Sequence, residues 1–307
     1  MFTRILVPLD GSRRSERALP YAAGLAKVFG SELALIHDET IGLRDDDVPA
    51  SADTLGRITD LVQALQNMGL RVWSGVVHGP AAEAILRAAD DAHADLIVMS
   101  THGRSGLGRW LYGSVADEVL RHTTLPIVLI TAACERRRRI EGPFRLLVPL
   151  DGSPLAEAAL GLAREVGDAL NAELMLLRVV EPADGFATLG TSYLPAQSQG
   201  ELDDAQAYLD DVSASSGMPG RRTARRIAAG DPAARIAAVA RDEDFDLIVM
   251  STHASGGLAR LTMGSVATSV LHRAATPTLL LRSAVAHRSV AGAGDESATS
   301  PRTTTVI

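Results

Sequence analysis

The sequence has a single cysteine, few aromatic residues and no long apolar run. Cys134 alone excludes an intrachain disulfide and any metal site built from several cysteines. Aromatic residues make up only 4% of the 307 residues, while hydrophobic residues make up 46%, which favours helices packed closely on a parallel sheet. No apolar run approaches the roughly 18 residues that a membrane-spanning helix needs, and the first residues are typical of a strand rather than a signal peptide. We therefore expect a soluble, cytoplasmic α/β protein that does not bind membranes.

An excess of positive charge is also missing. The formal net charge is -7, so general nucleic-acid binding is not expected. The run Arg136–Arg139 could contact a nucleic acid or an acidic partner, but a solvated linker is the favoured interpretation. Asp45–Asp47 could hold a divalent ion, yet an acidic loop is the simpler reading, and we predict no metal site. Cys134 has no activating partner in the sequence and is interpreted as a bystander.

Conventional catalytic motifs are absent as well. The chain has no Gly-x-x-x-x-Gly-Lys-Ser/Thr loop, no His-Glu-x-x-His helix and no Gly-x-Ser-x-Gly elbow. These absences count against a P-loop nucleotidase, a zinc protease and an α/β-hydrolase. We predict no catalytic residues.

What the sequence does contain is a long internal repeat. The segment Ile5–Ser12 (Ile-Leu-Val-Pro-Leu-Asp-Gly-Ser) returns as Leu146–Ser153, and the stretch Met99–Ser114 returns as Met250–Ser265. A repeat of this length indicates two copies of a whole domain. We predict a first half over residues 1–132, a linker over 133–143, a second half over 144–283 and a disordered tail over 284–307.

Apolar runs alternate with amphipathic segments in each half, which predicts βαβ units with right-handed crossovers. We expect two tandem domains, each an open, five-stranded parallel sheet with helices on both faces, as in Rossmann-like folds. The last strands of the halves should pair to form an intrachain pseudo-dimer, and a further homodimer is compatible with the sequence. The predicted strands are 4–9, 32–37, 70–77, 95–99 and 126–130, then 145–150, 174–180, 223–228, 246–250 and 278–281. The predicted helices are 15–29, 55–68, 81–92 and 114–122, then 155–170, 202–212, 232–241 and 265–273, and a loop is predicted over 181–201.

Ligands of open parallel sheets bind outside the carboxyl ends of the strands, at the point where the strand order reverses. If the first and fourth strands are neighbours, Asp10 meets the loop that ends at Ser114. Asp10 could accept a hydrogen bond from a ribose hydroxyl or an adenine-side donor. The alternative for Asp10, an N-cap or Asx turn before the first helix, is compatible with that role.

The loop before Ser114, and its repeat before Ser265, have the character of phosphate loops. Each passes from a strand end through small residues to a helix N-terminus, where N–H groups and the helix dipole favour an anion. We expect both serines to be N-caps and the preceding Gly113 and Gly264 to supply a positive φ or a close approach.

Other side chains of the two loops are less decisive. His102 and His253 could bind phosphate or fix the loop, and the sequence leaves both possibilities open. Arg104 and Arg109 could neutralise a triphosphate, but the second loop has Ser255 and Arg260 at these positions, so only one cationic position repeats.

These motifs together resemble the universal stress protein family in its tandem two-domain form. The resemblance covers about residues 2–131 and 144–282 and rests on three motifs that occur in order and twice. They are Ile-Leu-Val-Pro-Leu-Asp-Gly-Ser, Asp-Leu-Ile-Val-Met-Ser-Thr-His and Gly-Ser-Val-Ala. The resemblance implies the adenine nucleotide α-hydrolase-like fold and, for one branch of the family, ATP bound at a Gly-x2-Gly-x9-Gly-Ser/Thr loop.

Neither copy keeps that loop motif in full. The first copy has Ser100 in place of the first glycine, then Gly103 and Gly113-Ser114, whereas the second copy has Ser251, Ala254 and Gly264-Ser265. Asp38 places an acid where the family commonly has an apolar residue beside adenine, and Val179 keeps that pattern in the second copy. The first loop is therefore the better phosphate loop, and the second copy has the better adenine side. The positions implied to bind nucleotide are Pro8, Leu9, Asp10, Asp38, Met99, Ser100, His102, Gly103, Gly113, Ser114, Val115, Pro149, Leu150, Asp151, Val179, Met250, Ser251, His253, Ala254, Gly264, Ser265 and Val266.

The resemblance implies a regulatory module of the stress response that binds ATP, with or without Mg²⁺, or a related adenine nucleotide. Hydrolysis should be slow at most, because no base or water-positioning group accompanies the loop. One alternative is a nucleotide-free interaction protein with vestigial loops. Another is an adenylating or phosphotransfer enzyme, against which the missing Ser-Gly-Gly-x-Asp-Ser type of loop argues.

Overall fold

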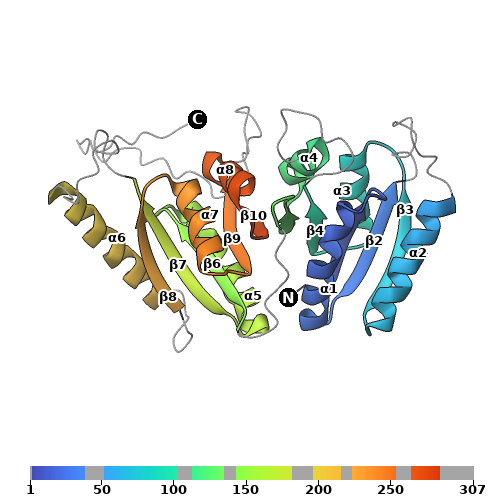
Figure 1. The fold of residues 1–307 in the computed structure, drawn as a ribbon, viewed down its shortest axis with the longest axis horizontal. Coiled ribbons are helices and arrows are strands. Elements are labelled where there is room, and N and C mark those ends of the chain that lie inside the picture. The colour runs from blue at the N-terminus through green and yellow to red at the C-terminus, as the bar shows by residue number, and fades with distance from the viewer. Residues whose placement is uncertain are drawn as a thin grey trace, which may run out of the picture.

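Two five-stranded halves form one continuous ten-stranded sheet in the computed structural model (Figure 1). The structure describes residues 2–38, 52–101, 113–134, 143–181, 196–215, 223–253 and 264–283. The predicted tail, most of the linker and the residues 182–195 lie outside these ranges. The strand order is β3-β2-β1-β4-β5-β10-β9-β6-β7-β8, and every pair is parallel except β5 with β10.

In the first half the strands are β1 (Arg4–Leu9), β2 (Glu32–Asp38), β3 (Arg71–Val77), β4 (Leu96–Ser100) and β5 (Ile127–Ile130). They are joined by the 3-10 helix η1 (Ser15–Arg17) and by α1 (Ala18–Phe29), α2 (Ala52–Asn67), α3 (Ala81–Asp91) and α4 (Ser114–His122). The second half has β6 (Arg145–Leu150), β7 (Glu173–Val180), β8 (Thr223–Ala229), β9 (Leu247–His253) and β10 (Thr278–Ser283). Its helices are α5 (Pro154–Leu170), α6 (Ala196–Ser215), α7 (Pro232–Asp242) and α8 (Ser265–Arg273).

The predicted fold class is confirmed, with differences at the helix starts. The first helix was expected from residue 15, but residues 15–17 form η1 and α1 begins at Ala18. The helix α6 begins at Ala196, inside the segment predicted to be a loop. A weak apolar period at the start of α6 explains that error, because amphipathic spacing is the signal from which helices are predicted.

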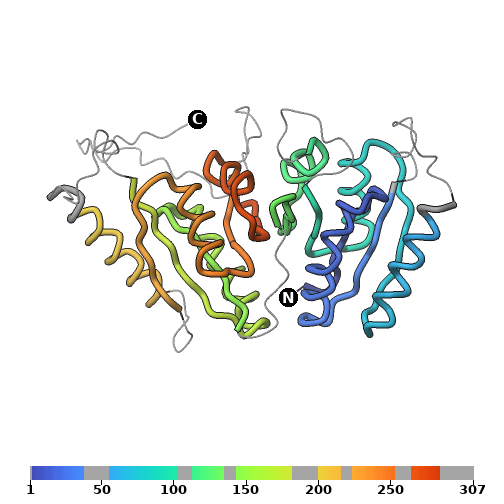
Figure 2. Tube along the Cα trace, viewed as in Figure 1, coloured from blue at the N-terminus to red at the C-terminus, as the bar shows by residue number. Residues whose placement is uncertain are grey.

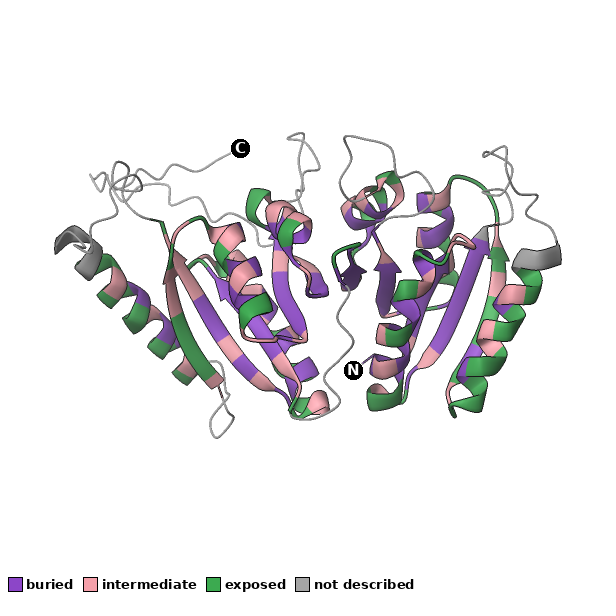
Figure 3. Ribbon diagram, in the orientation of Figure 1, coloured by how far each residue is buried: buried purple, intermediate pink, exposed green. Residues whose placement is uncertain are grey.

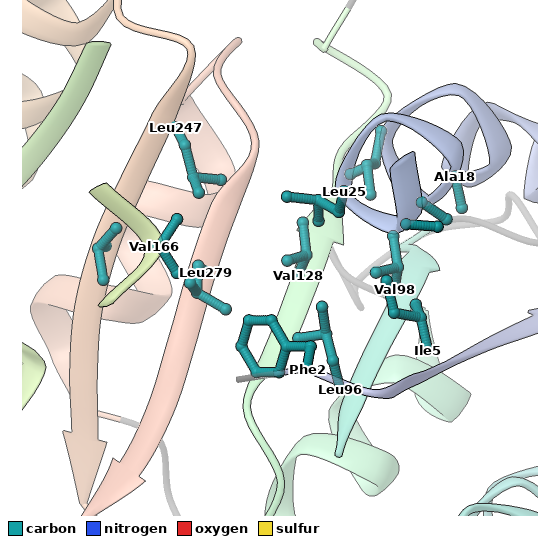
Figure 4. Packing of buried hydrophobic residues seen from close by; sticks show 14 of the residues in the cluster. Phe2, Ile5, Ala18, Leu25, Leu96, Val98, Val128, Val166, Leu247 and Leu279 are labelled. Carbon is teal, nitrogen blue, oxygen red and sulfur yellow. The ribbon is translucent and has the colours of Figure 1, made fainter. Parts of the chain in front are cut away.

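The helices divide between the two faces of the sheet. One apolar cluster joins one face of the strands to α1, α2, α5 and α6, and a second joins the other face to α3, α4, α7 and α8. Both clusters contain residues of the two halves, and Figure 4 shows side chains of the first cluster on both sides of the junction. Figure 2 shows the Cα trace of the two halves in the same view as Figure 1. Burial is greatest in the inner strands, whereas the edge strands β3 and β8 expose much of their length (Figure 3).

The junction between the halves is an antiparallel pair of equivalent strands. Leu129 pairs with Thr278, Val128 with Leu279, and Ile127 with Leu280. Val128 and Leu279 occupy the same position in the two halves, so they mark the centre of the pairing (Figure 4). The expected intrachain pseudo-dimer is therefore present, because each apolar last strand would otherwise leave a sheet edge unpaired.

Candidate functional site

The strand order reverses between β1 and β4 in the first half and between β6 and β9 in the second. The expected pairing of β1 with β4 is present, through Ile5 with Leu96 and Leu6 with Ile97. The crossover after β1 carries α1 on one face of the sheet, and α4 follows β4 on the other. The turn after β1 and the end of β4 therefore lie at the topological switch point, where open α/β sheets bind ligands.

A proline lies near the end of each first strand. Pro8 and Pro149 are in β1 and β6, and the pairing of those strands with β4 and β9 ends two residues earlier, at Leu6 and Leu147. Proline has no N–H to donate to a neighbouring strand. The two strands of each switch point are therefore not joined by backbone pairing where a ligand is expected.

Asp10 forms an Asx turn at the carboxyl end of β1. Its Oδ1 accepts from the Ser12 N–H at 3.0 Å and from the Ser12 hydroxyl at 2.6 Å. The second half repeats the turn, where Asp151 Oδ1 accepts from the Ser153 N–H at 2.9 Å and from its hydroxyl at 2.5 Å. The structural role considered for Asp10 is thus present in both halves. In each turn both bonds use the same carboxylate oxygen, and the second oxygen has no hydrogen-bond partner among the described residues.

The two halves differ just after this turn. In the second half Ser153 caps α5, because its hydroxyl accepts from the Ala156 N–H at 3.1 Å and Pro154 occupies the first helical position. In the first half the Ser12 hydroxyl accepts from the Ser15 N–H at 3.2 Å, and the chain passes through η1 before α1 begins. The exposed Arg13 and Arg14 occupy this irregular segment.

The loop after β4 returns close to its starting point at Gly113. This glycine has φ 76° and ψ 135°, and a Cβ placed on it would lie 2.5 Å from the carbonyl oxygen of the buried Thr101. Both expectations for Gly113, a positive φ and a close approach, are met. Gly264 has φ -55°, so the expected positive φ is wrong there, and its N–H lies 3.5 Å from Thr252 Oγ1.

The predicted N-cap role of Ser114 and Ser265 is wrong. Each serine is the first residue of its helix, and the caps are Gly113 and Gly264, which have no side chain to accept a bond. An N-cap must have non-helical dihedral angles, and the glycines supply them. The first-turn N–H groups of α4 and α8 therefore receive no bond from a capping side chain, which leaves them to another acceptor.

Of the two residues expected beside adenine, Val179 and Asp38, the structure describes the side chain only of Val179, in the second half. Val179 is partly buried and packs against the cluster on the α7 and α8 face. Asp38 ends β2, where it pairs with Val77, but its side chain lies outside what the structure describes. Sequence reasoning did not single out the preceding residue, His37. Its ring is 4% exposed, and neither nitrogen has a hydrogen-bond partner among the described residues.

The remaining predicted residues divide into three groups. The first group lies on the carboxyl parts of β1, β4, β6 and β9 and consists of Leu9, Met99, Ser100, Leu150, Met250 and Ser251. On the first turns of α4 and α8 are Val115, which packs against the core, and Val266, which is exposed. His102, Gly103 and Ala254 lie outside the described residues, as does the side chain of His253.

Ser251 behaves differently from the expectation that it could donate to a phosphate. Its hydroxyl donates to the carbonyl of Leu155 in α5, so its proton is engaged within the protein. Among the described residues, the Ser100 hydroxyl has no such bond. The described part of the second switch point therefore has one free hydroxyl donor fewer than that of the first.

Comparison with known proteins decides the family. A profile of the universal stress protein family matches residues 1–131 and 144–282. The chain belongs to the universal stress protein family. Universal stress protein Rv2623 of Mycobacterium tuberculosis is 27% identical over 296 residues, which cover 91% of this chain and 96% of that protein. The resemblance to this family that the sequence motifs indicated is thus confirmed.

Solved universal stress proteins share the tandem architecture. One from Pseudomonas aeruginosa UCBPP-PA14 matches with a TM-score of 0.66 at 19% identity, covering 92% of this chain and 93% of that one. One from Archaeoglobus fulgidus matches with a TM-score of 0.61 at 21% identity, covering 91% and 98%. A further universal stress protein, solved in complex with cAMP, matches 42% of this chain and 97% of its own at 24% identity, with a TM-score of 0.34.

The described residues contain neither a candidate membrane-spanning helix nor a candidate metal site. No helix among them is long and apolar enough to cross a bilayer. Within the same ranges, no group of three or more His, Cys, Asp or Glu side chains is arranged to hold a metal ion.

Proposed function

We propose that this universal stress protein is a regulatory module that binds an adenine nucleotide, with ATP held in the first half. The observation that carries the proposal is the pairing, at one switch point, of the Asp10 turn with the uncapped N-terminus of α4. An uncapped helix N-terminus after a glycine offers N–H groups and a positive dipole end to a phosphate. The second oxygen of Asp10 has no hydrogen-bond partner among the described residues and would accept from a ribose hydroxyl.

Gly113 supports this arrangement through its backbone. Its ψ of 135° at positive φ is accessible to glycine and strained for other residues, and its contact with the Thr101 carbonyl leaves no room for a side chain. The helix therefore starts directly beside the end of β4, and a phosphate at its N-terminus would lie over the switch point. Binding rather than turnover is proposed, since no general base accompanies these groups among the described residues.

A second candidate, a nucleotide-free interaction role, fits the second half better. Gly264 has an ordinary negative φ, and the Ser251 hydroxyl is engaged by Leu155. Asp151 retains the turn and Val179 packs against the core, so the second half would keep the framework of the site with fewer donors for a phosphate.

The test places a carboxylate where the phosphate would bind. Ser114→Asp adds negative charge at the first position of α4, which stabilises a helix through its dipole but repels a phosphate. We expect calorimetric titration with ATP and Mg²⁺ to show at least about tenfold weaker binding for Ser114→Asp than for wild type. Ser114→Asn is the matched neutral control, and Ser265→Asp reports on the second half.

Two results would overturn the proposal. One is the absence of ATP binding at millimolar nucleotide and magnesium, together with no nucleotide released from the denatured purified protein by mass spectrometry. The other is unchanged ATP affinity in the Ser114→Asp, Ser265→Asp double variant with an unaltered melting temperature.

A further inference from the structure

The turn after β1 carries an unmatched positive charge in the first half only. The side chains of Arg13 and Arg14 are exposed, and neither guanidinium has an ion pair or hydrogen bond to a described residue. Arg17, one turn later, is also exposed, and its guanidinium donates to the Ala132 carbonyl at 3.0 Å. The equivalent positions of the second half, at an offset of 141, are Pro154, Leu155 and Ala158.

The acidic groups of this segment do not cancel the charge of Arg13 and Arg14. Asp10 accepts from Ser12, and Glu16 is paired with Arg57 of α2, with Arg57 Nη2 2.9 Å from Glu16 Oε2. The second half has two carboxylates over the equivalent stretch, Asp151 and Glu157, and no cation. The turns after β1 and β6 therefore carry net charge of opposite sign.

The backbone that carries the two arginines is held in place. Ser15 is buried, its hydroxyl donates to the Ser12 carbonyl at 2.8 Å, and the Asp10 N–H donates to the Ser15 hydroxyl at 3.3 Å. The network fixes the backbone between Asp10 and η1, while the long side chains of Arg13 and Arg14 remain free to reach a ligand. In the second half the equivalent positions belong to the first turn of α5, which Ser153 caps.

We infer that Arg13 and Arg14 make the first half selective for a nucleoside polyphosphate over a monophosphate, whereas the second half lacks this preference. This inference rests on the proposed function and adds which nucleotides, those with more than one phosphate, the first half prefers. The phosphate nearest the N-terminus of α4 is held by N–H groups that a monophosphate also satisfies. Additional phosphates extend from the N-terminus of α4 towards the turn after β1. There the guanidinium groups of Arg13 and Arg14 bind them with charge-assisted and bidentate hydrogen bonds.

The experiment compares ATP, ADP and AMP in calorimetric titrations of the full chain. For Arg13→Ala/Arg14→Ala we expect ATP affinity to fall about tenfold, because each exposed charge pair contributes up to roughly fivefold. AMP affinity should change by less than about threefold, so the ratio of ATP to AMP affinity falls. Raising the salt concentration should weaken ATP binding less in this variant than in wild type.

The matched control removes two exposed arginines outside the turn, Arg164 in α5 and Arg241 in α7, in Arg164→Ala/Arg241→Ala. It changes the net charge equally and should keep the wild-type ratio. An unchanged ratio in Arg13→Ala/Arg14→Ala, or an equal fall in the control, overturns the inference while leaving ATP binding intact. Absence of any nucleotide binding to wild type overturns the proposed function and the inference with it.

Discussion

Arg282 in β10 of the second half donates to the carbonyl of Thr123, at 3.2 Å, at the C-terminal end of α4 in the first half. It also donates to the Arg121 carbonyl. The equivalent residue of the first half, Thr131, donates from its hydroxyl to the Ala274 carbonyl after α8, at 3.1 Å. Each half thus satisfies carbonyls at the C-terminal end of α4 or α8 in the other half, with a guanidinium in one direction and a hydroxyl in the other.

This exchange predicts that both residues stabilise the junction. Thr131→Val keeps the shape of a buried side chain but leaves the Ala274 carbonyl without this donor, so we expect a loss of about 1 kcal/mol in the free energy of unfolding. Arg282→Ala removes bonds from a charged donor and should cost about 2 kcal/mol. Urea unfolding is the measurement. Thr59→Val, an exposed threonine of α2 that bonds only locally to Leu55, is the control, and an equal loss there would contradict the prediction.

Gly113 and Gly264 should respond differently to alanine. Gly113→Ala meets both a positive φ and the Thr101 carbonyl, so we expect a loss of about 2–4 kcal/mol in unfolding free energy. Gly264→Ala needs no change of its negative φ and should cost less than about 1 kcal/mol.

Gly24→Ala tests whether the loss at Gly113 comes from its position. Gly24 lies within α1, and a Cβ there would meet nothing within 4 Å, so the substitution should raise stability by about 1 kcal/mol. Thermal and urea unfolding of the three variants give the ranking. Equal losses at Gly113 and Gly264 would show that φ does not distinguish the two loops.

Cys134 should make stability depend on alkaline pH. Burial raises the pKa of its thiol, while hydrogen bonds from Thr131 and the charge of Arg17 oppose that shift less strongly. The unfolded chain then loses the thiol proton at a lower pH than the folded chain does. Stability is therefore fully present below the ordinary thiol pKa, about 8.5, and falls as the pH rises above it.

The measurement is the unfolding free energy of wild type and Cys134→Ala between pH 7.5 and 10. We expect the difference between the two proteins to shrink as the pH rises, because only wild type carries the thiol. Burial also raises the pKa of Tyr21, to about 12, so its effect on stability begins only near the ordinary phenol pKa of about 10, and both proteins carry this residue. Parallel pH profiles, or rapid reaction of a thiol reagent with the native protein, would contradict the buried neutral thiol.

Ser153 and Ser12 occupy equivalent turns but should not contribute equally. Ser153→Ala removes the side-chain cap of α5 and should cost about 1 kcal/mol. Ser12→Ala removes the bonds from the Ser12 hydroxyl to Asp10 and from the Ser15 N–H to that hydroxyl. Because the turn after β1 is then less well ordered, we expect both the stability of the protein and the nucleotide affinity of the first half to fall. Calorimetry and unfolding together test this. A fall in nucleotide affinity for Ser153→Ala alone would place the ligand in the second half.

Much of the fold follows from local pattern. Continuous apolar runs before Asp-Gly-Ser fix β1 and β6, and the predicted bounds of α4 and α8 match the structure. Such segments are predictable because their burial and period are properties of consecutive residues. The start of α1 was not predictable in this way, because the Asp10, Ser12 and Ser15 bonds replace the first helical turn.

The site divides along the same line. The repeated Asp-Gly-Ser and Gly-Ser motifs located the turn and the helix start from the sequence, but the capping role given to Ser114 was wrong. A serine can cap only where its own backbone is non-helical, and the tight return of the chain to Thr101 assigns that position to Gly113. The unpartnered ring of His37 was also beyond prediction, since burial of a polar group depends on which helices cover its strand.

The sequence by itself determined that this chain is a tandem α/β protein of one family, because repeated motifs and apolar periods are written in neighbouring residues. The tertiary structure decided how the halves depend on each other. Thr131 with Ala274 and Arg282 with Thr123 are separated by 143 and 159 residues, and they meet only because β5 and β10 pair antiparallel. The pairing of β1 with β4, also between distant segments, decided that the turn carrying Arg13 and Arg14 lies at a switch point.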